Sequence, residues 1–436
     1  LAYTSGTTGV GKGTMLSHDA CTTFVRYLQQ FNFPEEVRLV SYLPVSHVAS
    51  MSLDVLTSAL FGWSVYFADK EALKGSLADY LKMVKPTVFL GVPRIYEKIQ
   101  DKIEKKVSSA GFVKKAIFNF ARGQDEAELR NVLQGKDASW RYNLARKLVY
   151  NKLRKEIGFD ETLYFIVGAA PIQEKTHRFF HSLGMFIANA YGLSETMGGI
   201  TTLFPHNFHE YRYNSCGKVV EGADMLIGDE GEIMFRSRTC FMGYLGRAKD
   251  TLEMIDGLKR VHTGDVGHID DAGRLFIKGR IKELIVTAGG ENVAPYPIEN
   301  LIMDKLKGFA SWAVVVGDNR KFLTLFLTIR NANDMMQRPT DELDADAVKE
   351  LERYEIHATN MKELMHGENY AKLSKVIEEA ISYANSKAVS NASKIKRWRV
   401  LPRDFSIATE ELTPTLKLKR KKVEKHFQDV FDEVYN

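Results

Sequence analysis

Residues 3–13 read Tyr3-Thr4-Ser5-Gly6-Thr7-Thr8-Gly9-Val10-Gly11-Lys12-Gly13, a stretch with four aliphatic hydroxyl groups, four glycines and one lysine. Glycines let the backbone bend until several N–H groups point at one anion. The hydroxyls add further donors, and Lys12 adds a positive charge. The stretch therefore predicts a loop that binds a polyphosphate. A flexible linker is the weaker explanation, because linkers rarely place a lysine between glycines and continue into an apolar pattern.

The spacing from Gly6 to Gly11-Lys12 also matches the P-loop of kinases and GTPases. That motif needs Ser or Thr directly after the lysine to bind Mg²⁺. Here Gly13 follows, which argues against a P-loop enzyme. Formation of ADP or GDP from the corresponding triphosphate would favour this alternative again.

The overall composition is that of an ordinary globular protein of 436 residues with a formal net charge of +5. This mild basic bias favours anionic ligands in general, and we predict no nucleic-acid partner. The three cysteines lie far apart without metal-ligand spacing, which indicates a reducing compartment. The sequence shows no secretory signal and no apolar run long enough to span a bilayer. We therefore predict a cytoplasmic protein and leave peripheral contact with an intracellular membrane open.

The order of segments predicts the fold class. Strand-like and helical segments alternate from residue 38 to residue 189, which predicts mostly parallel strand–helix layers. Residues 108–156 interrupt them with a charged helical insertion on the surface. We expect an α/β large domain over residues 1–279, including a small β-rich subdomain at about 215–279. A hinge at 280–283 and a smaller α+β C-terminal domain at 284–436 follow.

Residues 3–13 resemble the phosphate loop of the adenylate-forming superfamily, which contains acyl-CoA synthetases, luciferases and the adenylation domains of peptide synthetases. Family members usually have proline before the lysine, whereas this chain has Gly11. Further segments match in the same order, so the resemblance covers essentially the whole chain. Residues 43–48, 191–196 and 413–420 are most similar to long-chain fatty acyl-CoA synthetases of the bubblegum type. Since the chain starts at Leu1, inside the strand expected to lead into the loop, we expect an N-terminal part of the large domain to be missing.

The resemblance implies a nucleotide site. The residues expected to bind ATP or AMP are Thr4, Ser5, Gly6, Thr7, Thr8, Gly9, Gly168, Ala169, Ala170, Tyr191, Gly192, Ser194, Asp265 and Arg280. Within this set, Tyr191 would flank the adenine and Ser194 would contact the α-phosphate. Asp265 would accept both ribose hydroxyls, and Arg280 would reach the ribose-phosphate. Each residue taken singly has an ordinary structural explanation as a turn or a surface charge, and only their joint order favours a site.

The resemblance also implies catalytic residues, which are Lys12, His47, Glu195 and Lys417. Glu195 would bind Mg²⁺, because a hard cation that bridges phosphates prefers carboxylate oxygen. His47 would lie near the acyl carboxylate, although a single histidine is as often structural. Lys417 opens a basic run that ends at Lys422. A localisation or lipid-binding role is the competing explanation for this run.

Two further roles concern the C-terminal domain. Lys282 matches the hinge between the domains. Gly289, Gly290 and Glu291 match a loop that faces CoA, and a plain hairpin turn is the alternative there.

The implied activity is ATP-dependent conversion of a long-chain fatty acid to acyl-AMP and then to acyl-CoA, with release of AMP and pyrophosphate. The expected partners are the fatty acid, ATP, Mg²⁺ and CoA. The alternatives are adenylation of an aryl or amino acid, and a non-catalytic lipid or nucleotide binder. Fatty-acid-dependent pyrophosphate exchange would distinguish the enzyme from the binder.

Overall fold

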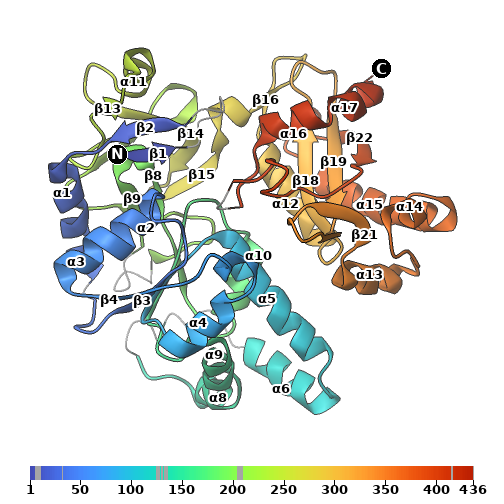
Figure 1. Ribbon diagram of the computed structural model, residues 1–436, viewed down its shortest axis with the longest axis horizontal. Helices are drawn as coiled ribbons and strands as arrows, with labels where there is room; N and C mark the ends of the chain where they lie inside the picture. Colours follow the sequence, from blue (N-terminus) through green and yellow to red (C-terminus); the bar gives the residue numbers. More distant parts are fainter. Residues whose placement is uncertain are drawn as a thin grey trace. The chain divides into compact units, whose positions relative to one another are not determined.

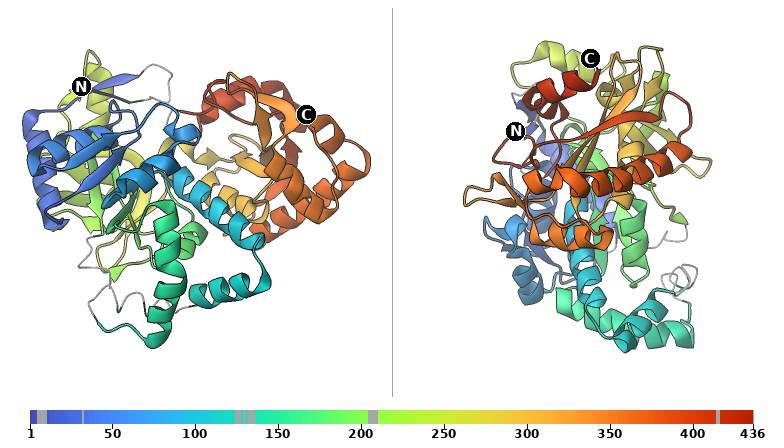
Figure 2. Two further views of the ribbon diagram at one scale, coloured as in Figure 1. Left: turned by 60° about the horizontal axis from the view of Figure 1, so that its bottom comes forward. Right: turned by 90° about the vertical axis from the view of Figure 1, so that its right-hand side faces the viewer.

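The computed structural model describes residues 1–4, 11–31, 33–123, 128, 131, 136–203, 210–413 and 416–435 (Figure 1). The chain folds into two compact units. The first contains residues 1–263 and 267–277, and the second contains residues 264–266 and 278–436. Both units combine helices with sheets (Figure 2). The predicted α/β class, with a smaller α+β part at the C-terminal end, is confirmed.

The first unit is built on two parallel sheets. Strand β3 pairs with β4, and β5, β6 and β7 form the other sheet in that order. The Thr87 N–H, just before β5, donates to the Arg38 carbonyl in β3 at 3.0 Å, which joins the two sheets. The parallel strands are β3 (Arg38–Ser41), β4 (Ser64–Phe67), β5 (Val88–Gly91), β6 (Tyr164–Val167) and β7 (Ile187–Asn189).

Alternating side chains bury both faces of the β5-β6-β7 sheet, whereas β4 at the edge of the other sheet is largely exposed. Phe89 and Phe165 point to one face and belong to a large core that also contains Tyr96 and Phe180 from helices. Val88 points to the other face, where a second apolar cluster packs. Because successive side chains of a strand point to opposite faces, a strand with apolar residues at every position is covered by helices on both sides.

Helices and π-helical turns of the first unit surround these sheets. Helix α1 begins after Ser17, whose Oγ accepts the Ala20 N–H at 2.9 Å and so caps the helix. The segment Met51–Thr57 is a π-helix that leads into α3. The segments are α1 (His18–Leu28), α2 (Val48–Ser50), the π-helix η2 (Met51–Thr57), α3 (Ser58–Phe61), α4 (Leu77–Val84), α5 (Pro93–Ser108), α6 (Phe112–Arg122), α8 (Trp140–Ala145), the π-helix η4 (Arg146–Tyr150), α9 (Asn151–Ile157), α10 (Glu174–His181) and α11 (Ala248–Met254).

Three antiparallel sheets complete this part of the chain, in the orders β1-β2-β13, β10-β9-β8 and β11-β12-β14-β15. The last of them lies in the stretch where the sequence pattern predicts a β-rich subdomain. The strands are β1 (Ala2–Thr4), β2 (Lys12–Met15), β8 (Tyr191–Leu193), β9 (Gly198–Thr202), β10 (Lys218–Val219), β11 (Asp224–Ile227), β12 (Glu232–Arg236), β13 (Gly243–Tyr244), β14 (Val261–Ile269) and β15 (Leu275–Arg280).

The second unit has a three-stranded sheet, β18-β19-β22, with helices on both faces. Leu325 of the central strand packs into a core with α12 and α15, whereas Phe326 packs against Phe427 and Phe431 from the C-terminal segment. The elements are β16 (Ile285–Val286), β17 (Asn292–Val293), α12 (Pro295–Lys305), β18 (Ala310–Val316), β19 (Leu323–Ile329), β20 (Asn331–Asn333), β21 (Pro339–Leu343), α13 (Ala345–Leu351), α14 (Met361–Leu364), α15 (Gly367–Ser386), β22 (Ile395–Val400), α16 (Arg420–His426) and α17 (Gln428–Tyr435).

Candidate active site

The strands that flank the predicted phosphate loop pair with each other. Strands β1 and β2 are antiparallel, and Thr4 lies opposite Lys12 in their register. Ser5, Gly6, Thr7, Thr8 and Gly9 lie outside the described residues. A Cβ atom at Gly11 would lie 3.3 Å from the Thr4 carbonyl oxygen, so a larger residue would need a small shift of that backbone.

One tyrosine links Lys12 to Glu195. Strand β2 pairs with β13 on its other side, which brings Tyr244 next to Lys12. The Lys12 ammonium lies 4.9 Å from the centre of the Tyr244 ring, and the hydroxyl of the same tyrosine donates to the Glu195 carboxylate. A cation over an aromatic face and a short hydrogen bond to a carboxylate are both favourable contacts. The structure therefore brings together two of the predicted catalytic residues.

Asp250 completes this group from helix α11. Its carboxylate lies 3.2 Å from the Lys12 ammonium and 3.4 Å from the Arg247 guanidinium. The hydrogen bond from Lys12 is the largest cause that lowers the Asp250 pKa below its usual value. Asp250 therefore carries a full negative charge at neutral pH and opposes an anion approaching Lys12.

Sequence reasoning missed Tyr244 and Asp250. Neither belongs to a loop rich in glycine or hydroxyl groups, and both lie far along the chain from Lys12. Only the pairing of β2 with β13 places them beside the lysine. A Gly-Tyr pair before a helix with an acidic first turn was the only local signal.

Glu195 sits in a single 3₁₀ turn, Ser194–Thr196, held by the Thr196 hydroxyl, which accepts the Leu193 N–H at 2.9 Å. The Glu195 side chain is buried. Within the part of the chain that the structure describes, no group of three or more His, Cys, Asp or Glu side chains could hold a metal. A lone carboxylate is what Mg²⁺ needs when phosphate oxygens and water supply its other ligands. The donor set therefore fits a magnesium ion that arrives with a nucleotide.

The predicted adenine segments have tight packing of their own. The Tyr191 ring is buried, with its centre 5.9 Å from that of Phe235. A Cβ atom at Gly192 would lie 1.7 Å from the Gly198 carbonyl oxygen, so the close approach of β8 and β9 already explains this glycine. Gly168 and Ala169 follow β6, and Ala169 adopts a left-handed backbone with φ of 69°. The roles of these residues, of Ala170 and of Ser194 in nucleotide binding stay predictions.

His47 caps a helix. Its Nδ1 accepts the Ala49 N–H at 3.2 Å at the start of α2. This contact gives the histidine a structural role, and its predicted position near the acyl carboxylate stays a prediction.

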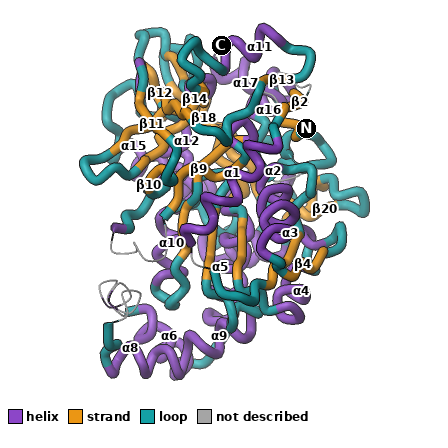
Figure 3. Tube along the Cα trace, turned by 90° about the vertical axis from the view of Figure 1, so that its left-hand side faces the viewer, coloured by secondary structure: helices purple, strands orange, loops and turns teal. Residues whose placement is uncertain are grey.

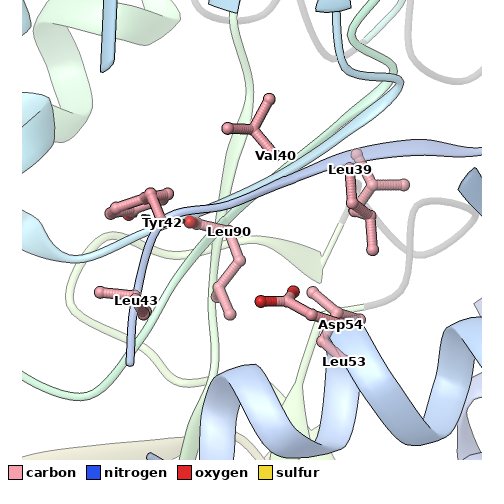
Figure 4. A pocket seen from close by; sticks show the side chains of 8 residues that line it. Leu39, Val40, Tyr42, Leu43, Leu53, Asp54 and Leu90 are labelled. Atoms are coloured by element: carbon pink, nitrogen blue, oxygen red, sulfur yellow. Dashed lines mark hydrogen bonds between the residues drawn. The ribbon is translucent and has the colours of Figure 1, made fainter. Parts of the chain in front are cut away.

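A buried carboxylate lies in a small pocket between β3, β5 and η2 (Figure 4). The Asp54 carboxylate points toward Leu90, and it accepts hydrogen bonds from Ser41 at 2.7 Å and Ser50 at 2.6 Å. Burial raises the Asp54 pKa above its usual value. The two serines satisfy this polar group, which accounts for it as part of the fold.

In the second unit, three predicted residues gather. The Arg280 guanidinium lies 3.0 Å from the buried carboxylate of Asp265. Lys417 lies close enough for both groups to shift its pKa. Burial, the largest cause, and the positive charge of Arg280 lower the Lys417 pKa, Asp265 and Glu283 act in the opposite direction, and the net pKa is about 8. Lys417 is therefore an unusually weak base that stays mostly charged at pH 7.

Two side chains of the basic run after Lys417 form ion pairs within the second unit. Arg420 pairs with the buried Glu299, and Lys422 lies 2.7 Å from Glu410. The buried pair of Arg420 and Glu299 gives this arginine a structural role, and the catalytic role of Lys417 stays a prediction.

The remaining predicted residues lie at the start of the second unit. Lys282 is exposed in the 3₁₀ turn Ile281–Glu283. Gly289, Gly290 and Glu291 form the exposed tip of the hairpin between β16 and β17, and Gly290 has a φ of 79°. The backbone of this loop is thus a hairpin turn. The contact of the loop with CoA and the hinge role of Lys282 stay predictions.

Comparison with protein families gives two matches. The family described as AMP-binding enzyme matches residues 1–245. The family described as AMP-binding enzyme C-terminal domain matches residues 282–366.

Among curated proteins, the chain is 42% identical to long-chain-fatty-acid–CoA ligase ACSBG2 of Gallus gallus, over all of this chain and 58% of the relative. It is 40% identical to ACSBG2 of Xenopus laevis, covering 60% of that protein, and 39% identical to long-chain-fatty-acid–CoA ligase ACSBG1 of Rattus norvegicus, covering 61%. In each case the whole of this chain is matched. The chain thus spans about three fifths of the length of these relatives.

Among solved structures, the adenylation domain of a carboxylate reductase from Mycobacterium chelonae superposes with a TM-score of 0.67, over all of this chain and 59% of that one. O-succinylbenzoate coenzyme A synthetase from Bacillus subtilis, in complex with AMP, gives 0.61, over 97% of this chain and 68% of that one. The identities are 20% and 17%, so these likenesses concern the fold.

Proposed function

Because this chain belongs to the family of AMP-binding enzymes, we propose that it activates a long-chain fatty acid with ATP and transfers the acyl group to CoA. The products are acyl-CoA, AMP and pyrophosphate. The substrate class is inferred from the relatives described as long-chain-fatty-acid–CoA ligases.

The observation that carries the proposal is the group formed by Lys12, Tyr244 and Glu195. A triphosphate needs both a cation and a carboxylate that can hold its metal, and here one tyrosine contacts the two. Lys12 would bind the phosphate oxygens that become pyrophosphate, and Glu195 would hold Mg²⁺. When bound, the ion would neutralise phosphate charge.

In the first step, a carboxylate oxygen of the fatty acid forms a bond to the α-phosphorus. The bond from that phosphorus to the bridging oxygen breaks, and pyrophosphate leaves with the electron pair. The barrier is largely the repulsion between two anions. Lys417 would offset the charge that develops at the α-phosphate, and Asp265 and Arg280 would hold the ribose. His47 would orient the fatty acid.

In the second step, the thiolate sulfur of CoA bonds to the acyl carbon, the bond from that carbon to the phosphate oxygen breaks, and AMP leaves with the oxygen and the electron pair. Residues 1–279 and 284–436 would act as two domains joined by a hinge at 280–283. Rotation at Lys282 would replace Lys417 by the loop Gly289–Glu291 for this step.

The test is fatty-acid-dependent exchange of labelled pyrophosphate into ATP, followed by measurement of AMP and acyl-CoA in the presence of CoA. We expect exchange with long-chain acids and none without Mg²⁺. Exchange driven by aryl or amino acids would contradict the substrate class. Absence of any exchange in the full-length protein would contradict the enzymatic activity and leave a binder.

A further inference from the structure

The helices of the insertion carry large apolar side chains on their outer side. Helices α6 and α8 contact each other and lie beyond the sheets of the first unit (Figures 1 and 3). The outer face, as we call it, consists of Phe112, Val113 and Ile117 of α6, Trp140 and Leu144 of α8, and Leu148 of the π-helix η4 that follows α8. Phe112 is 86% exposed, Val113 68% and Trp140 69%.

Helical periodicity separates this face from the core. Phe118 of α6 is buried, and at about 100° per residue it lies on the other side of the helix from Val113. In α8, Tyr142 and Ala145 are buried in the same way. The inner sides of both helices are therefore already packed, and the apolar outer side needs a separate explanation.

Basic side chains surround the outer face. Helix α6 contains Lys114 and Lys115 and no acidic residue, whereas its third cation, Arg122, packs on the buried rings of Phe118 and Phe179. The Arg141 guanidinium lies 5.6 Å from the Trp140 ring centre. Across residues 111–156, eleven lysines and arginines stand against five aspartates and glutamates. Apolar and aromatic residues flanked by such cations are typical of helices that lie in the headgroup region of an anionic bilayer.

We propose that the outer face of α6 and α8 docks the protein on an anionic lipid surface. The apolar side chains enter the headgroup boundary, and the flanking lysines and arginines bind lipid phosphates and carboxylates. The run from Lys417 to Lys422 is a weaker candidate for this role, because Arg420 and Lys422 are paired within the fold. The proposal does not depend on the catalytic activity.

The experiment is flotation of the full-length protein with phosphatidylcholine vesicles, with and without 30% phosphatidylserine. The test variant is Val113→Glu, and the matched control is Val389→Glu, since Val389 is 97% exposed in the second unit. Glutamate in the first turn of α6 favours the helix, so the variant retains its fold, which circular dichroism checks. The fluorescence of Trp140 is obtained by subtracting the spectrum of Trp140→Phe from that of the wild type. A shift of this Trp140 emission on adding vesicles reports contact at the outer face itself.

We expect vesicles with phosphatidylserine to bind at least about tenfold more tightly than neutral ones. Val113→Glu should weaken binding by about tenfold or more, and Val389→Glu by less than about twofold. Equal effects of the two variants, equal binding to both kinds of vesicle, or no binding would overturn the proposal. So would a dimer in sedimentation that Val113→Glu dissociates, because the face would then be covered by a second copy.

Discussion

The low pKa of Lys417 leads to a sharp prediction about pH dependence. With a pKa of about 8, the side chain is about ten parts charged to one part neutral at pH 7, and the ratio is reversed at pH 9. If the charged form stabilises the transition state of adenylation, the rate must fall by about tenfold between these two values. An ordinary lysine would stay charged throughout this range.

The measurement is fatty-acid-dependent pyrophosphate exchange from pH 6.5 to 9.5 in the wild type and in Lys417→Arg. Arginine stays charged, so the decline centred near pH 8 should disappear in the variant. Glu283→Gln removes a negative charge that raises the Lys417 pKa, so the decline should move to lower pH. Lys417→Ala should abolish acyl-AMP formation and spare thioester formation from supplied acyl-AMP.

A wild-type profile that stays flat to pH 9.5 would refute this reasoning. So would a decline that persists unchanged in Lys417→Arg, because the titrating group would then be a different one. Equal loss of both half-reactions in Lys417→Ala would refute the division of roles.

Three further predictions concern the first unit. Tyr244→Phe removes the hydrogen bond to Glu195 and keeps the ring beside Lys12, so pyrophosphate exchange should need several-fold more Mg²⁺. The control is Tyr27→Phe, which loses a hydroxyl that donates to the Gly222 carbonyl. An equal change in the Mg²⁺ requirement of both variants would contradict the role of Tyr244. Asp250→Asn removes a charge that opposes ATP at Lys12, so the KM for ATP should fall about two- to threefold at low salt. The control Asp224→Asn should leave this KM unchanged. A rise in the KM for ATP in Asp250→Asn would mean that Asp250 positions the lysine. Gly192→Ala should lower the free energy of unfolding, measured by chemical denaturation, by about 1–3 kcal/mol or more, because its Cβ would overlap the Gly198 carbonyl. Gly257→Ala is the control and should have little effect, because the space around Gly257 is open. Similar stability of the two variants would contradict the close packing of β8 and β9.

Local sequence determined much of this protein. The phosphate-loop composition, the alternation of strands and helices, and the order of the motifs were sufficient for the α/β class and the family, because these signals lie within short stretches. The cap at Ser17 and the helix start at Pro93 follow from local backbone chemistry in the same way.

The tertiary structure alone decided which side chains share a site. Tyr244 and Asp250 reach Lys12 only because β13 pairs with β2, and this pairing joins segments that are far apart in the chain. The weak basicity of Lys417 likewise depends on its burial and on the charge of Arg280. Burial and long-range pairing are properties of the packed chain, so composition and spacing cannot reveal them.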